Sequence, residues 1–304
     1  MSSAKPPTAE PPAAEPPAAA ATELRLLVDA FEQWQRMRVQ TGERIRAVLQ
    51  GRDGTADPAQ EAEEDVDQVL VRIRRGEDDG PQPMLAAMYR TCYREEESFT
   101  AALLAGLEEH PAWPWLSQVK GVGPLLGAKL LSRLDARRAP TPSSFWAYCG
   151  LATVPGVEYR CQTCGRTLAF PASYSVTGAH KVQGGRRTCG GQLLPGPARV
   201  RVAQPRVARG EAGAYNVFAK KVCYLLGVSF LRTRSPYSRE YAAHRERLEE
   251  LHPGWDPKRR HLTAMRRMEK RFLADLWLAW REALGLPTTA PYALARLDPL
   301  PAGV

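Results

Sequence analysis

The feature that most constrains the fold is a short glycine-containing bend between two apolar helical patterns. The stretch WLSQVKGVGPLLGAKLLSRL, residues 115–134, places Gly121 and Gly123 at this bend. Glycine has no Cβ atom, so the bend can adopt positive φ and approach another surface closely. The first amides of the following helix lack partners within the helix and, with the helix dipole, favour anions. The pattern therefore predicts a helix-hairpin-helix that holds backbone phosphates, with contacts from Lys120, Gly121, Val122, Gly123 and Lys129.

An ordinary tight connection between two helices is the alternative interpretation of this bend, and the distribution of charge helps to choose between them. The chain has 304 residues and a formal net charge of +9. Residues 1–110 carry a net charge of −9, whereas residues 111–194 carry +8 and residues 195–271 carry +11. The basic part thus begins at the hairpin, as expected for a protein whose partner is a polyanion. A basic but merely solvated surface is the alternative.

The apolar runs are too short to cross a bilayer, and the N-terminus lacks the apolar core of a signal peptide. We therefore expect a cytoplasmic protein without a membrane partner. The predicted fold class is mainly α: a helical N-terminal arm, a helix-hairpin-helix core and C-terminal helices, with a small β zinc-ribbon-like insert. The predicted divisions are a disordered Pro/Ala tail (1–22), an acidic helical bundle or arm (23–110), the helix-hairpin-helix (111–156), the insert (157–200), a basic helical region (201–287) and a C-terminal tail (288–304).

Within the arm, apolar spacing near three and four residues predicts helices over residues 22–49, 61–74 and 84–109. The run Glu95–Glu97 is expected on a solvated face. We hypothesise that these helices form a homodimer. The expected buried positions of the third helix are Leu85, Met88, Phe99, Leu103, Leu104 and Leu107.

A cysteine pair in the sequence CQTCGR, residues 161–166, is typical of one half of a zinc knuckle. Cys189 lies at the distance expected for the second half, but Arg186 occupies the position where its partner cysteine would stand. His180 is the best substitute, and Cys149 is a second candidate. The prediction is one structural zinc ion held by Cys161, Cys164, His180 and Cys189. The alternative is a knuckle fold without metal, or a reduced CxxC loop.

Two basic helices are predicted after the insert. Residues 214–232 form a helix with Lys220 and Lys221 directed outward, and residues 258–284 form the longest amphipathic helix. On the second helix, a cationic stripe suited to phosphates lies opposite an apolar face; a solvated helix face is the alternative. The apolar face comprises Met265, Met268, Phe272, Leu276 and Trp280, and the stripe comprises Arg259, Arg260, Arg266, Arg267, Lys270 and Arg271.

The hairpin, the stretch SSFWAYCGLATVPG (143–156) and the stretch AYNVFAKKVCYLLGVSF (214–230) together resemble a known family. They are similar to the C-terminal helix-hairpin-helix domain of Piv/MooV-type DNA invertases and of the IS-one-ten group of insertion-sequence transposases. The later stretches SPYSREY and RRHLTAMRRMEKRFLADLWLAWREALGLP are similar to free-standing phage and archaeal relatives. The resemblance covers residues 110–295 and implies DNA as the partner and a mobile-element origin.

Two departures from that family bear on catalysis. The ribonuclease-H-like domain with its four acidic residues is replaced here by acidic helices. The family's serine turn should directly precede Tyr215, where this chain has Arg-Gly-Glu-Ala-Gly (209–213). The expectation is therefore a DNA-binding protein without catalysis of its own. One alternative is an active transposase or recombinase with Ser173, Ser175 or Ser235 as nucleophile; another is an RNA-binding or assembly subunit.

Overall fold

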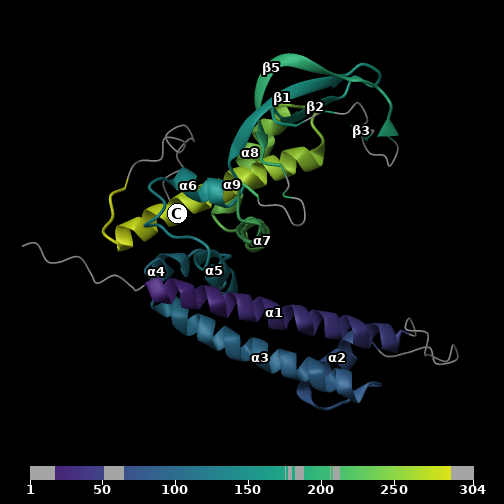
Figure 1. The fold of residues 1–304 in the computed structure, drawn as a ribbon, viewed down its shortest axis with the longest axis vertical. Coiled ribbons are helices and arrows are strands. Elements are labelled where there is room, and N and C mark those ends of the chain that lie inside the picture. Colours follow the sequence, from purple (N-terminus) through teal and green to yellow (C-terminus); the bar gives the residue numbers. More distant parts are fainter. Residues whose placement is uncertain are drawn as a thin grey trace, which may run out of the picture. The chain divides into compact units, whose positions relative to one another are not determined.

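The structure is a computed structural model that describes residues 18–50, 65–174, 176, 180–181, 188–205, 207 and 213–288. Residues 1–17 and 289–304 of the predicted tails lie outside these residues, as does Ser175, whereas residues 18–22, predicted as disordered, form the start of the first helix. The described chain is mainly helical with a small antiparallel β insert, which confirms the predicted fold class (Figure 1). It divides into two compact units, Met1–Leu134 with Ala283–Gly285, and Asp135–Glu282 with Leu286–Val304.

The first unit is built on two long helices, α1 (Ala18–Leu49) and α3 (Pro83–Glu108), which pack side by side (Figure 1). The short helix α2 (Val66–Arg75) packs on both near the end of α1. The hairpin helices α4 (Trp113–Leu116) and α5 (Pro124–Leu131) pack at the other end, where α3 finishes. The arm therefore serves as the support on which the hairpin is built.

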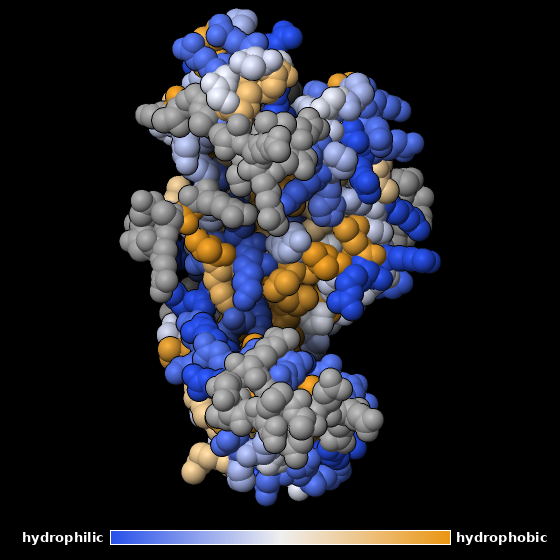
Figure 2. Space-filling model, turned by 90° about the vertical axis from the view of Figure 1, so that its right-hand side faces the viewer, coloured by the Kyte–Doolittle hydropathy of each residue, from blue (hydrophilic) through white to orange (hydrophobic). Residues whose placement is uncertain are grey.

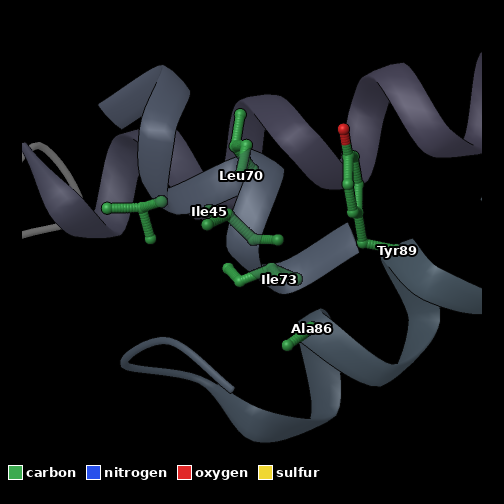
Figure 3. Packing of buried hydrophobic residues seen from close by; sticks show 6 residues of the cluster. Ile45, Leu70, Ile73, Ala86 and Tyr89 are labelled. Atoms are coloured by element: carbon green, nitrogen blue, oxygen red, sulfur yellow. The ribbon is translucent and has the colours of Figure 1, made fainter. Parts of the chain in front are cut away.

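The apolar side of α2 fills the space between the two long helices. Leu70 and Ile73 point toward Ile45 of α1 and toward Ala86 and Tyr89 of α3, and all five side chains are buried (Figure 3). The helix has clear ends, since the Asp65 side chain accepts the amide of Asp67 and Gly76 adopts a φ of 76°.

The face that α3 turns inward differs from the prediction. Met88 and Leu104 were expected in the core but are 36% and 38% exposed, whereas Tyr89 and Cys92 are buried. Glu96 was expected on a solvated face but is buried, where it accepts a 2.5 Å hydrogen bond from Arg38. The pair of Arg38 and Glu96 explains this difference. A prediction from apolar spacing places carboxylates on the surface, and it therefore assigned the wrong side of α3 to the core.

The second unit combines a β insert with three long helices. Its elements are α6 (Pro142–Tyr148), β1 (Thr153–Cys161), β2 (Thr167–Pro171), β3 (His180–Lys181), β4 (Thr188–Cys189), β5 (Leu193–Ala203), α7 (Val217–Thr233), α8 (Tyr237–Leu251) and α9 (Pro257–Ala283). One antiparallel sheet has the order β2–β1–β5, and β3 pairs with β4 in a second. The register of β1 with β5 shifts between Val157 and Tyr159.

Helix α9 is the centre of the second unit. The apolar side chains predicted for one face are all buried, and the rings of Phe230, Tyr237 and Phe272 contact one another. Near its end, the indole N–H of Trp277 donates to the Ala139 carbonyl at 2.7 Å. Arg281 donates to the carbonyls of Ala136, Ala139 and Pro287. These bonds tie α9 to the segment that precedes α6.

Replacing Ile73 with alanine should reveal how much of the first unit's stability rests on α2. The side chain is fully buried, so its loss should lower the free energy of unfolding by about 2–5 kcal/mol. Val71 on the same helix is 39% exposed, so Val71→Ala should change stability by less than about 0.5 kcal/mol. Urea denaturation of the two variants measures the difference, and equal effects would contradict the described packing.

Candidate nucleic-acid interface and metal centre

The bend between α4 and α5 is a tight, partly exposed turn. The first helix of the hairpin is a single turn, Trp113–Leu116, and the chain reaches the bend through further turns. Gly121 has a φ of 99°, which L side chains rarely adopt, and the amide of Val122 donates to the Val119 carbonyl at 2.9 Å. Val122 is mostly buried, whereas Lys120 and Gly123 are exposed. The turn therefore exposes Lys120 and Gly123 to solvent and keeps Val122 inside.

The exposed end of the bend is also the N-terminus of α5. Gly123 caps the helix in an extended conformation, and the next residue, Pro124, has no amide proton. Within the part of the chain that the structure describes, no group accepts a hydrogen bond from the amides of Gly123, Leu125 or Leu126. These donors lie at the positive end of the helix dipole, so they suit an anion.

Lys129 was predicted as a phosphate contact, but the structure places it inside the first unit. Its side chain is 10% exposed, its ammonium lies 2.5 Å from the Glu32 carboxylate of α1, and it sits 4.8 Å from the centre of the Phe31 ring. Arg133 similarly forms an ion pair with Asp29 of α1. These contacts give Lys129 a structural role in fastening α5 to α1 and do not favour its predicted phosphate contact. Local spacing could not predict this pairing, because Glu32 lies almost a hundred residues earlier in the chain.

The predicted cationic stripe of α9 divides into two rows. In the first row, Arg260 pairs with Glu249, Arg267 with Glu240 and Arg271 with Asp275, at 3.4, 2.6 and 3.2 Å. In the second row, Arg259, Arg266 and Lys270 form no ion pair with any residue that the structure describes. The two rows follow the helical repeat, since 259, 266 and 270 share one side of the helix and 260, 267 and 271 the next.

The unpaired row is half-buried, and two of its three members lie over aromatic rings. The Arg259 guanidinium lies 3.8 Å from the Trp255 ring centre, and the Lys270 ammonium lies 5.3 Å from that of Trp146. On α7, Lys220 is half-buried with its ammonium 4.2 Å from the Tyr215 ring, while Lys221 is exposed. Such cation–π contacts hold a positive charge in place while leaving part of it accessible.

One acidic side chain, Glu269, is buried beside these cations. It is 6% exposed, and among the described residues no hydrogen bond or ion pair reaches its carboxylate. Burial raises its pKa to about 7, although the charges of Arg266 and Lys220 act in the opposite direction. Sequence analysis missed this residue, because a single Glu within a basic stretch carries no signal of its burial.

The four residues predicted as metal ligands converge at the end of the β insert. The ligand atoms of Cys161, Cys164, His180 and Cys189 all lie within 4.8 Å of one another. The sulfurs of Cys161 and Cys189 are 3.9 Å apart, close to the roughly 3.8 Å that two Zn–S bonds at a tetrahedral angle require. The Cys164 sulfur lies 3.2 Å from Nε2 of His180. Three thiols and one imidazole in this arrangement could hold a zinc ion.

Local geometry prepares this cluster for a metal. The Cys164 amide donates to the Cys161 sulfur, and this bond lowers the pKa of the Cys161 thiol toward the thiolate form that binds metal. The register pairs His180 with Cys189 and Cys161 with Leu193, so the short strands bring the two halves together. Cys149, the second candidate for the fourth ligand, is fully buried elsewhere and faces Cys223 of α7.

Neither of the two candidate nucleophiles that the structure describes, Ser173 and Ser235, is hydrogen-bonded through its hydroxyl to a described acid or base. Ser235 is 1% exposed at the start of α8, and its hydroxyl meets no hydrogen-bond partner among the described atoms. Ser173 lines a pocket of about 480 Å³ whose described lining contains only Gln204 and Tyr215 as further polar side chains. The described lining therefore offers Ser173 no histidine or carboxylate as a base.

The hairpin segment is similar to a known transposase family. Residues 114–156 match the Transposase IS116/IS110/IS902 family model. The matched segment runs from α4 through the bend, α5 and α6 into β1, so it contains the exposed turn and excludes the metal cluster and α9. This chain is thus transposase-related over that segment. No curated protein matches the chain.

The surface and the helices add two further observations. The face shown in Figure 2 is largely hydrophilic and also displays some hydrophobic residues. None of the helices in the described residues is both long enough and apolar enough to cross a bilayer.

The metal assignment can be tested by elemental analysis of the purified protein. We expect about one zinc per chain, lost in the Cys164→Ser and His180→Ala variants because each removes a ligand. Cys149→Ala serves as the matched control and should retain full zinc content. Zinc loss in the control with retention in His180→Ala would instead identify Cys149 as the fourth ligand.

Because Glu269 is buried, replacing it with the neutral Gln should raise the free energy of unfolding, by an amount that depends on pH. Between about pH 4.5 and pH 7 the folded chain keeps this proton while the unfolded chain releases it, so the residue's contribution to stability falls as pH rises. Glu269→Gln should therefore match the wild type near pH 4.5 and exceed its unfolding free energy by up to about 3 kcal/mol at pH 8. Chemical denaturation at both pH values measures this, with the exposed Glu282→Gln as control; equal stabilities at pH 8 would contradict the described environment.

Proposed function

We propose that this protein is a transposase-related DNA-binding protein that holds the sugar-phosphate backbone and does not itself cut or join strands. The hairpin bend supplies backbone amides and Lys120, and α7 and α9 supply further cations. DNA is the proposed partner, bound with little sequence preference because the contacts are to phosphates. The metal cluster, as a structural zinc site, folds the β insert, and the protein works in the cytoplasm, with the first-unit helices available for pairing with a second copy.

The observation that carries this proposal is the exposed N-terminus of α5. Its first amides have no acceptor among the described residues, Lys120 stands beside them, and the whole element falls within the segment that matches the transposase model. A phosphate oxygen satisfies such amides and the dipole together. The excess of positive charge from residue 111 onward supports the same partner.

The proposed lack of catalysis is supported by the surroundings of the serines. A phosphoryl-transfer nucleophile needs an adjacent base and access to the scissile phosphate. Ser235 is buried, and the described pocket around Ser173 contains no base. Trapping a covalent protein–DNA adduct would contradict this part of the proposal and favour the serine-recombinase alternative.

Gly123→Asp provides a sharp test because it should affect folding and binding in opposite directions. A Cβ atom at this position meets nothing within 4 Å and the backbone is extended, so aspartate fits as an N-cap. Its carboxylate would accept the amides of Leu125 and Leu126 and stabilise the helix by about 0.5–1 kcal/mol. The same carboxylate would displace and repel a phosphate, so affinity for duplex DNA should fall at least about tenfold.

Gly123→Ala is the matched control, since it adds a Cβ atom but leaves the amides available. It should bind DNA nearly as well as the wild type while being slightly less stable. Fluorescence anisotropy with duplex DNA and with RNA of the same length gives the affinities, and thermal unfolding gives the stabilities. Full binding by Gly123→Asp would refute the role of the bend, and a preference for RNA would favour the RNA-binding alternative.

A further inference from the structure

Four cations from three elements of the second unit share one electrostatic environment. They are Arg201 of β5, Lys220 of α7, and Arg266 and Lys270 of α9, here named the cation cluster. Trp146 links Lys270 to Arg201, because its indole donates to the Lys270 carbonyl while its own carbonyl accepts the amide of Ala152, next to the Thr153 to which Arg201 donates. A Cβ atom added at Gly227 of α7 would meet the Glu269 carboxylate at 3.1 Å, and the charges of Arg266 and Lys220 both act on that carboxylate. Arg201 was not singled out from the sequence, because it lies in a strand far from the predicted basic helices.

The side chains of the cluster are held in place. The Trp146 indole donates to the Lys270 carbonyl at 2.9 Å, and its ring faces the Lys270 ammonium. Arg201 donates to the hydroxyl and carbonyl of Thr153 on the neighbouring strand. Lys220 rests on the Tyr215 ring, which is itself fixed by a hydrogen bond to the Pro205 carbonyl. Three of the four positive charges are thus fixed in position before any ligand binds.

This arrangement is electrostatically unfavourable in the free protein. Arg266 and Lys270 are half-buried, and no described carboxylate pairs with any member of the cluster. Burial, aided by the charges of Arg266 and Arg201, lowers the pKa of Lys270 to about 8. Their neighbour Glu269 compensates only in part, because its own pKa lies near 7. Fixed like charges of this kind are typical of sites that bind an opposite charge at some expense of stability.

The other cations of α9 provide an internal contrast. Arg260, Arg267 and Arg271 carry the same charge on the same helix, yet each is already paired with a carboxylate. A phosphate approaching them would have to compete with Glu249, Glu240 or Asp275. A phosphate approaching the cluster would meet cations from β5, α7 and α9 together, none of them in an ion pair with a described carboxylate.

We infer that the cation cluster is a phosphate-binding site for the DNA backbone, in which Arg201, Arg266 and Lys270 contact the phosphate and Lys220 contacts its neighbour along the strand. Trp146 is a positioning residue that holds Lys270. The paired row of Arg260, Arg267 and Arg271 takes no part in the site. The identity of the polyanion as DNA rests on the function proposed above.

The test compares two double variants that remove equal charge from the full-length protein. Arg266→Gln with Lys270→Gln removes two members of the cluster, whereas Arg239→Gln with Arg260→Gln removes one exposed and one paired arginine. DNA affinity is measured by anisotropy over a range of salt concentrations. The cluster variant should lose about 10- to 100-fold in affinity and its log–log salt slope should fall by about 1 to 2, whereas the control should change by less than about threefold. Equal losses in the two variants would overturn the assignment.

Thermal unfolding shows whether the cluster variant loses affinity only because it is less stably folded. Because the cluster is repulsive in the free protein, the Arg266→Gln, Lys270→Gln variant should be at least as stable as the wild type at pH 6, where Glu269 keeps its proton and needs no compensation from Arg266. A lower melting temperature together with lower affinity would indicate a structural role and contradict the inference.

Titration of Lys270 gives an independent measurement. The groups that act on it are Arg266 of its own helix and Arg201 of β5, with the uncharged Trp146 of α6 on its face. Wild-type affinity should fall between pH 7 and pH 9 as Lys270 loses its proton, and Lys270→Arg should flatten that decline because guanidinium does not titrate there. An unchanged pH profile in Lys270→Arg would count against Lys270 as a contact.

DNA binding by the wild type, by Gly123→Asp and by the cluster variant distinguishes failure of this inference from failure of the proposed function. If wild-type protein fails to bind DNA, the proposed function fails. If it binds, and Gly123→Asp weakens binding while the cluster variant behaves like its control, the hairpin proposal stands and the cluster assignment alone is wrong. Tighter binding of RNA by wild-type protein would retain the phosphate site and replace the partner.

Discussion

The ion pair between Lys129 and Glu32 decides how the hairpin is held. It is almost excluded from solvent and joins α5 to α1, with Arg133 and Asp29 forming a second link one turn away. Removing one partner of such a buried pair leaves an uncompensated charge, which is far more damaging than losing an exposed pair. The acidic arm therefore balances part of the positive charge of the hairpin. It neutralises Lys129, which faces inward, and leaves Lys120 and the N-terminus of α5 at the surface.

The same principle organises the second unit. Helix α9 carries its positive charges in two rows, and α8 supplies carboxylates to only one of them. The row toward α8 contributes to packing, while the other row stays positive beside β5 and α7. One helix can thus form the core of the unit through its apolar face and carry uncompensated positive charge on another face.

The sequence predicted those features that depend on local spacing. The apolar repeat located α9 and its buried face to within a residue, and the spacing of Cys161, Cys164 and Cys189 indicated a metal centre that the fold indeed brings together with His180. The features it could not predict depend on residues far apart in the chain. Glu32 beside Lys129, Arg201 beside Lys270 and Arg38 beside Glu96 each join segments whose proximity only the tertiary fold creates.

The bonds from Trp277 and Arg281 reach into the segment that matches the transposase model. They satisfy the carbonyls of Ala136 and Ala139, which lie inside the segment that matches the transposase model, and the donors come from the far end of α9, outside it. In this chain the matched segment is therefore completed by donors that lie outside it. A fragment of this chain that ended at residue 156 would leave these carbonyls without the donors that α9 supplies, so the matched segment is best studied together with that helix.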